Sequence, residues 1–127
     1  MTDIPDELRG WWRIVETSQW MDDGLDDLGP ALISFTGRDD RLRMQCLIAD
    51  IRARPTATGV AFTWTGAWEW DPMSGDGDAR IGEGGRLTGT FSIRDGDHST
   101  FTAVRADQPD EPIPDPPSYR DKWRGRR

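Results

Sequence analysis

The stretch from residue 60 to residue 71, VAFTWTGAWEWD, limits what this chain can fold into more than any other part of it. Apolar or small residues occupy every second position, namely Val60, Phe62, Trp64, Gly66, Trp68 and Trp70. A period of two predicts a strand with one buried face. Each tryptophan on that face buries on the order of 150–250 Å² of surface, so the strand needs a second sheet or a sheet that curls onto itself. Gly66 in the middle of the run allows the bend or bulge with which a small barrel turns a corner.

Shorter strands are predicted on both sides of this stretch, because turn residues recur about every 8–12 residues and no long helical period is present. Residues 21–30 predict one helical turn in a lid-like loop, since Leu25 and Leu28 are three positions apart. We expect about seven or eight antiparallel strands between residues 10 and 105. The segments outside the central stretch are 10–17, 31–36, 41–51, 79–81, 86–94 and 98–105, with a loop at 71–78.

The length of 127 residues and a change in composition define the domain organisation. We expect residues 1–106 to form one β-barrel domain. Residues 107–127 hold five of the nine prolines and few aliphatic residues, which predicts a flexible, Pro-rich, basic tail.

Cysteine content and hydropathy indicate a cellular compartment. Cys46 is the sole cysteine, so no internal disulfide can form, and no Cys/His cluster has zinc-ligand spacing. The N-terminus MTDIPDELRG lacks the basic start and apolar run of an export signal, and the chain has no long apolar stretch. We therefore expect a cytoplasmic protein with no metal, no cofactor and no membrane contact.

The charge of the chain is unevenly distributed. The net charge is −7, but five basic residues against Asp121 give residues 120–127 a charge of +4 and leave −11 on residues 1–119. Such an acidic surface repels phosphate backbones, so nucleic acid is not an expected partner, whereas a basic protein is. The alternative is that the acidity only keeps a small protein soluble and monomeric.

Gly10 and Trp12 on the first predicted strand, with Arg105 at the end of the last, resemble the signature of the lipocalin and calycin barrels. The resemblance implies that the tryptophan closes one end of the barrel and that the arginine packs across it. The second half, from Phe62 through Gly75-x-Gly77 to Arg105, is similar to a group of small bacterial lipocalin-like proteins without an assigned activity. The fold class expected is therefore all-β, a single antiparallel lipocalin-like barrel of about seven or eight strands with a disordered tail.

A barrel of about eight strands has an interior that is either filled by side chains or wide enough for one small ligand, and periodicity does not separate the two. Trp20 and the acidic loop 22–27 are candidates for the rim of such a ligand site. The residues predicted to face a ligand are Trp20, Phe62, Trp64, Trp68, Trp70, Phe91 and Phe101.

Three further residues, Glu69, Asp71 and His98, are polar site candidates. Two carboxylates with different pKa values suit acid/base hydrolysis, yet strand parity turns Glu69 and Asp71 away from the tryptophans unless a bulge intervenes. The acids at 71–78 do not match the EF-hand ligand spacing for calcium. His98 is the sole histidine; haem ligation is the alternative to an exposed residue beside a turn.

These observations predict a non-catalytic barrel that binds a small apolar or aromatic molecule in its open end. No residue is assigned a catalytic role. The alternative is an acidic protein-interaction module with a solid core, and the third reading is a hydrolase that uses Glu69 and Asp71.

Overall fold

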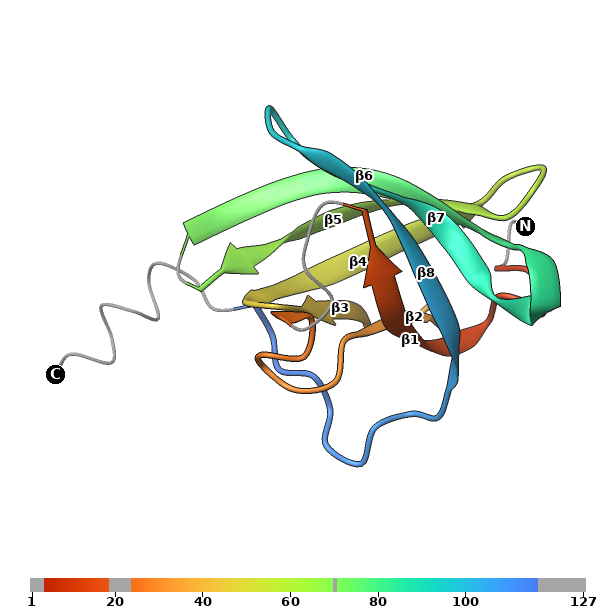
Figure 1. The fold of residues 1–127 in the computed structure, drawn as a ribbon, viewed down its shortest axis with the longest axis horizontal. Helices are drawn as coiled ribbons and strands as arrows, with labels where there is room; N and C mark the ends of the chain where they lie inside the picture. The colour runs from red at the N-terminus through yellow and green to blue at the C-terminus, as the bar shows by residue number, and fades with distance from the viewer. Residues whose placement is uncertain (1–3, 19–23, 70, 117–127) are drawn as a thin grey trace, which may run out of the picture.

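The computed structural model describes residues 4–18, 24–69 and 71–116. Across these residues, eight antiparallel strands form a closed barrel in which each strand is hydrogen-bonded to the next along the chain and the last returns to the first (Figure 1). The predicted all-β antiparallel barrel is confirmed. The elements are β1 (Gly10–Thr17), β2 (Leu32–Phe35), β3 (Asp40–Met44), β4 (Leu47–Pro55), β5 (Val60–Trp68), β6 (Asp71–Ile81), the short 3-10 turn η2 (Glu83–Gly85), β7 (Leu87–Ile93) and β8 (His98–Ala106).

The segment 41–51, predicted as one strand, is a hairpin of β3 and β4. Gln45 adopts a φ of 54°, and Met44 pairs with Leu47 across the two-residue turn. Cross-strand partners point to the same side of a sheet. The inward residues are therefore even-numbered before the turn, as Met44 is, and odd-numbered after it, as Leu47 is. Leu47 is therefore buried, whereas Cys46 is half-buried in the turn.

The tryptophan strand ends earlier than predicted. Glu69 has a φ of 58°, and Trp68 pairs with Asp71 across a two-residue turn. The predicted loop 71–78 and the predicted short strand 79–81 are together the eleven-residue strand β6, which pairs with both β5 and β7.

Two glycines of β6 leave space for the aromatic rings of β5. Gly75 is the register partner of Trp64, and Gly77 is the partner of Phe62. A Cβ atom on Gly75 would lie 2.7 Å from Trp64 Nε1 and 1.8 Å from the carbonyl oxygen of Ser92. A Cβ atom on Gly77 would lie 2.5 Å from Phe62 Cζ. These glycines are strand residues that allow a close approach, and this is why a loop prediction based on them was wrong.

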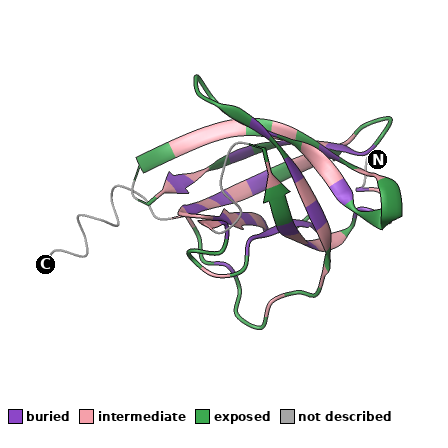
Figure 2. Cartoon of the chain, viewed as in Figure 1, coloured by how far each residue is buried: buried purple, intermediate pink, exposed green. Residues whose placement is uncertain are grey.

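Burial alternates along β5, as predicted, only as far as Gly66. Val60, Phe62 and Trp64 are 1–2% exposed, whereas Thr63 and Thr65 point to solvent. Gly66 lies against the backbone of its partner Ala49, where an added Cβ would be 2.6 Å from the Cα atom. Beyond it the buried residue is Ala67, and Trp68 is only partly buried. Figure 2 shows this mixture of buried and exposed residues along the strands.

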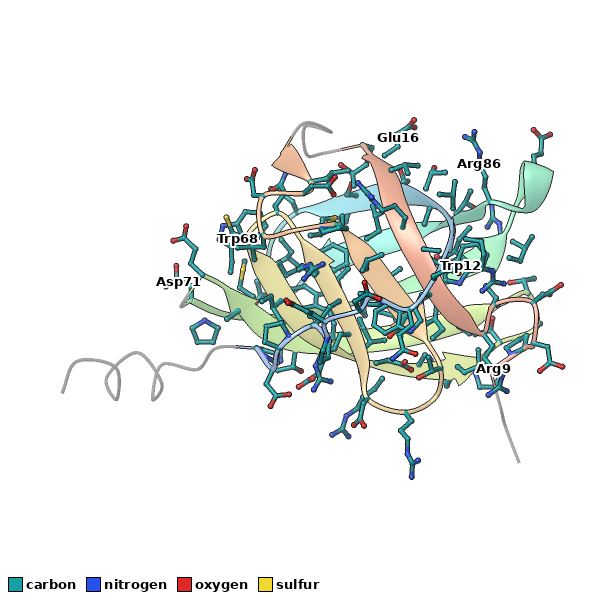
Figure 3. All side chains as sticks on the ribbon, turned by 90° about the horizontal axis from the view of Figure 1, so that it is seen from below. Arg9, Trp12, Glu16, Trp68, Asp71 and Arg86 are labelled. Carbon is teal, nitrogen blue, oxygen red and sulfur yellow. The ribbon has the colours of Figure 1, made fainter. Side chains whose placement is uncertain are left out.

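After β8 ends at Ala106, residues 107–116 run without regular secondary structure across the outside of the barrel. In Figures 1 and 3, two views turned by 90°, this segment crosses β2 and β3 on the outer side. Ile113 within it is 5% exposed. Residues 117–127, the rest of the predicted tail, lie outside the described residues. In the described part of the chain, no helix has the length and apolar character needed to span a bilayer.

Candidate functional site

One end of the barrel is closed by a contact between its first and last strands. The guanidinium of Arg105 lies 4.0 Å from the centroid of the Trp12 ring, and the two residues are register partners. The Trp12 indole donates a hydrogen bond of 2.9 Å to the carbonyl oxygen of Leu8. Arg105 donates two further bonds of 2.7 Å to the carbonyl oxygens of Arg9 and Glu7. The N-terminal segment is thereby fixed over this end, where Figure 3 labels Arg9 and Trp12.

Gly10 is required by this closure. Its φ of 120° is a conformation that residues with a Cβ atom rarely adopt, and a Cβ there would lie 3.1 Å from Arg105 Nη1. The Gly-x-Trp spacing therefore places Gly10, which can adopt this positive φ, two residues before the buried Trp12 ring.

The aromatic residues predicted to face a ligand pack against one another. Trp64 and Phe91 are stacked with ring centroids 4.8 Å apart, and Phe62 lies 5.7 Å from Phe35. The indole of Trp64 donates a 3.0 Å hydrogen bond to the carbonyl oxygen of Ser92, which satisfies its polar atom. Phe101 is also buried. Trp68 lies at the edge of the core, and Trp20 and Trp70 lie outside the described residues.

A small void lies beside these aromatic residues in the interior of the barrel. Its volume is about 10 Å³, which is close to the space of one water-sized sphere. The residues around it are Ile14, Thr17, Ile33, Leu42, Met44, Phe91, Thr100 and Phe101.

The opposite end of the barrel from Trp12, here called the acidic end, is formed by turns that contact one another. Gln45 N donates to the carbonyl oxygen of Leu25 at 2.8 Å, and Glu69 N donates to that of Cys46 at 2.9 Å. Burial, and then the negative charges of Glu69 and Asp27, raise the pKa of the Cys46 thiol. A raised pKa keeps the thiol protonated at neutral pH, so it is a poor nucleophile.

The acidic end takes its name from five exposed carboxylate residues in its turns and strand ends. Leu25 of the predicted lid-like loop is buried there and belongs to the core, while Leu28 is exposed. Asp26 fixes the loop by pairing with Arg13 and by accepting a 2.8 Å bond from Ala31 N. The five residues that define the acidic end are Asp27, Glu69, Asp71, Asp95 and Asp97.

The other polar candidates are spread over the surface. Glu69 lies in the β5–β6 turn and Asp71 begins β6, and both are exposed to water. Asp76 and Asp78 are exposed along the outer face of β6. His98 is exposed at the start of β8. Within residues 4–18, 24–69 and 71–116, no three His, Cys, Asp or Glu side chains come together as a metal site.

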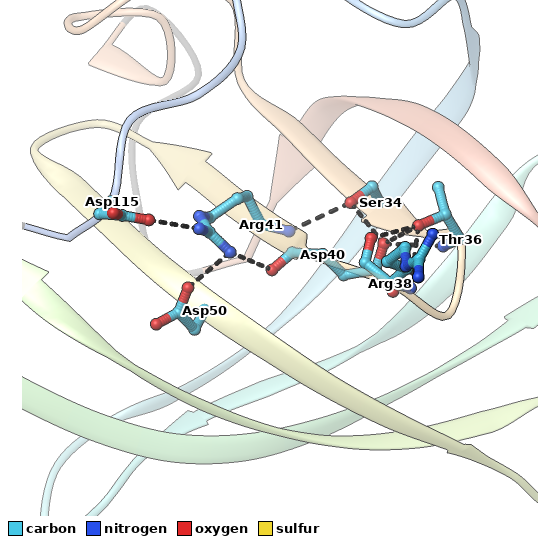
Figure 4. Close-up of polar contacts among 7 residues, drawn as sticks. All are labelled: Ser34, Thr36, Arg38, Asp40, Arg41, Asp50 and Asp115. Atoms are coloured by element: carbon cyan, nitrogen blue, oxygen red, sulfur yellow. Dashed lines mark hydrogen bonds and ion pairs between the residues drawn. The ribbon is translucent and has the colours of Figure 1, made fainter.

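The structure contains a polar cluster at the β2–β3 turn that was not among the predicted site residues (Figure 4). The buried carboxylate of Asp40 accepts hydrogen bonds from Thr36 N, Thr36 Oγ1 and Gly37 N at 2.6–2.8 Å, and from Ser34 Oγ at 3.0 Å. These bonds fix the turn before β3 begins. An acidic residue three positions after a glycine was the available signal.

Arg41 connects this cluster to the C-terminal segment. Its guanidinium pairs with Asp50 on β4 at 2.6 Å and with Asp115 beyond β8. A cleft of about 760 Å³ lies between the segment and the β2–β3 turn. Its walls are Trp11, Thr36, Arg38, Asp39, Arg41, Gln108, Pro109, Pro112, Ile113 and Asp115.

Comparison of the chain with protein-family models, with curated proteins and with solved structures finds no match. The closed antiparallel barrel of eight strands is consistent with a calycin-like fold.

Proposed function

We propose that this chain is a non-catalytic protein-interaction module: a barrel with a solid interior that recognises a basic partner through its outer surface. The observation that carries the proposal is the interior void of about 10 Å³. Sites for small organic ligands measure about 300–1,000 Å³. Because its own aromatic residues fill the interior, this barrel would bind a partner on its outer surface.

The distribution of charge supports a basic partner. Residues 1–119 carry −11, and at the acidic end the turns that carry Asp27 and Glu69 are each hydrogen-bonded to the turn at Gln45 and Cys46. Fixed charges of one sign attract an oppositely charged partner and speed up its association.

Titration of a fluorescein-labelled hexa-arginine peptide tests this function. The peptide should bind the full chain with an affinity that falls as salt rises. The double variant Glu69→Gln/Asp71→Asn should weaken binding about 3- to 10-fold, since each exposed ion pair contributes about 0.2–1 kcal/mol. The matched control Asp76→Asn/Asp78→Asn removes the same charge from the side of the barrel and should change the affinity less than about twofold. Equal weakening by both variants would refute a site at the acidic end.

A second candidate is the binding of a small apolar or aromatic molecule inside the barrel. It is favoured by the lining of the void, which is mostly apolar and includes Met44, a side chain that adapts its shape easily. Native mass spectrometry should then show an adduct, and fatty acids or flavonoids should quench tryptophan emission saturably. Met44→Phe, which fills the void, should abolish both signals. If the unmodified chain shows neither signal, this candidate is eliminated.

We also infer that the barrel is related to the lipocalins and that it works in the cytoplasm. The meeting of Gly10, Trp12 and Arg105 at one barrel end supports the relationship. A sole cysteine supports a reducing compartment.

A further inference from the structure

The outer wall of the barrel over β1, β2 and β3 is covered by residues 107–116, here called the strap. Ile113 of the strap is 5% exposed, yet it does not belong to the core cluster inside the barrel. Ser34 alternates with the inward residues Ile33 and Phe35 on β2, so its side chain points outward, and it is nevertheless fully buried. Ile113 is therefore buried on the outer side of the barrel, beside Trp11 and the β2–β3 turn to which Ser34 is hydrogen-bonded.

The apolar part of this region combines prolines with an aromatic ring. Trp11 is the outward neighbour of the buried Trp12 and the register partner of Ser34. It lines the same cleft as Pro109, Pro112 and Ile113. Aromatic side chains that line a groove are the usual means by which proteins bind extended proline-rich peptides.

The polar part of this region is the ion pair between Arg41 and Asp115, in which Arg41 is also bound by a residue of the barrel. The Arg41 side chain is 18% exposed, and its guanidinium is fixed by Asp50 at 2.6 Å. It also donates a 3.3 Å hydrogen bond to the carbonyl oxygen of Asp40. Asp115 of the strap pairs with Nη2 of this guanidinium, as Figure 4 shows. The barrel thus presents one oriented cation to whichever acid occupies the groove.

The proline rings of the strap favour an extended backbone. Pro112, Pro114 and Pro116 have their φ angles fixed by their rings. The residues before them, Glu111, Ile113 and Asp115, are restricted to extended conformations. Such a segment loses little conformational entropy when it docks. Because proline has no N–H group, the segment cannot add to the sheet as a strand, and recognition depends on its side chains.

We propose, in addition to the recognition of a basic partner above, that the outer wall of β1–β3 is a second interaction surface, which binds a partner segment of the pattern proline, aliphatic residue, proline, acidic residue. Residues 112–115 of the strap are a built-in copy of that segment, which a partner displaces. The cleft of about 760 Å³ beside the strap gives a partner space for side chains larger than those of the strap.

The test measures binding of a fluorescein-labelled peptide with the sequence of residues 107–116, DQPDEPIPDP, to the full chain. In the unmodified chain the strap competes at a high effective concentration, so binding is weak. Two variants release the strap by different means: Ile113→Ser removes the apolar anchor, and Asp115→Arg reverses the charge. Both should bind the peptide about tenfold more tightly than the unmodified chain. The second variant keeps the test decisive if the first does not fold.

In the Asp115→Arg background, Arg41→Ala should abolish the gain in affinity. Arg52→Ala, which removes an exposed cation from the neighbouring strand β4, should retain the gain. Equal affinity of the unmodified and released chains, or equal binding of a peptide with Ser and Asn in place of its Ile and last Asp, overturns the proposal. A dimer in light scattering that Ile113→Ser converts to a monomer also overturns it, because the occupant is then a second copy. The hexa-arginine titration is a separate readout, so failure of the interaction role remains distinguishable.

Discussion

On the inner side of β5 and β6, Phe62 and Trp64 are buried because the strand beside them has glycines at the matching positions. On the outer side of β1–β3, Ile113 is buried because a segment without secondary structure lies across the wall. The first burial is part of the sheet and cannot be undone without opening the barrel. The second depends on one aliphatic side chain and one ion pair, so it can open while the barrel stays closed. The interior therefore provides stability, and the covered wall is suited to exchange.

The largest expected effect is on the inner side. Trp64→Ala removes the stack on Phe91 and leaves the carbonyl oxygen of Ser92 without its indole donor. We expect a loss of about 3–5 kcal/mol in the free energy of unfolding, because the large cavity cannot collapse in a closed barrel. Urea denaturation followed by circular dichroism measures it. A loss below about 1 kcal/mol would mean that the interior is not tightly packed.

Gly77→Ala tests the close approach of β5 and β6. The added methyl would lie 2.5 Å from Phe62 Cζ and 2.3 Å from the carbonyl oxygen of Thr90, so the ring and the strand must both move. We expect about 1–3 kcal/mol of destabilisation, as for other overpacked sites. Gly24→Ala is the control, since its nearest neighbour would be at an ordinary 3.5 Å. Similar unfolding midpoints for both variants would contradict the role given to Gly77.

Ile113→Ser tests the outer side. Global stability should fall by about 1 kcal/mol, because the strap can detach and the loss cannot exceed its docking free energy. Amide hydrogen exchange of residues 107–116 should rise to nearly random-coil rates, while β5 and β6 keep their protection. If β1–β3 lose protection together with the strap, the strap and the barrel unfold as one cooperative unit, which would contradict independent opening of the strap.

Asp115→Asn should have the smallest effect. Its side chain is 86% exposed, so breaking the pair with Arg41 should cost about 0.2–1 kcal/mol at low salt and less at high salt. Hydrogen exchange of the strap at two ionic strengths measures this difference. A larger cost that is independent of salt would show that Arg41 is held chiefly by this pair and not by Asp50.

The parts of the fold that could be predicted are those in which a repeating pattern carries the information. Alternation from Val60 to Trp64 predicts the inward face of β5, and the resemblance of Gly10, Trp12 and Arg105 to a family signature led us to expect a contact that the structure contains. The two tight turns could not be predicted, because Gln45 and Glu69 adopt positive φ without the Asn-Gly or Asp-Gly sequence that usually marks such turns.

No repeating sequence pattern predicted the groove on the outer wall of β1–β3. Arg41 and Asp115 are 74 positions apart, and nothing in either local sequence indicates that they pair. Ile113 is a single aliphatic residue among prolines, so no period marks it as buried. The Arg41–Asp115 pair and the burial of Ile113 depend on which surface residues the folded barrel brings close together. A local sequence pattern does not contain that information.

The pairing of the last strand β8 with the first strand β1 determines when the barrel can close during synthesis. Every strand pair except β1–β8 joins strands that follow one another in the chain, so β1 to β7 can assemble in order during synthesis. β1 and β7 remain open edges until β8 has been made, and open edges are sites of aggregation. A chain terminated before His98, where β8 begins, would therefore be a curled sheet whose two edges stay unpaired.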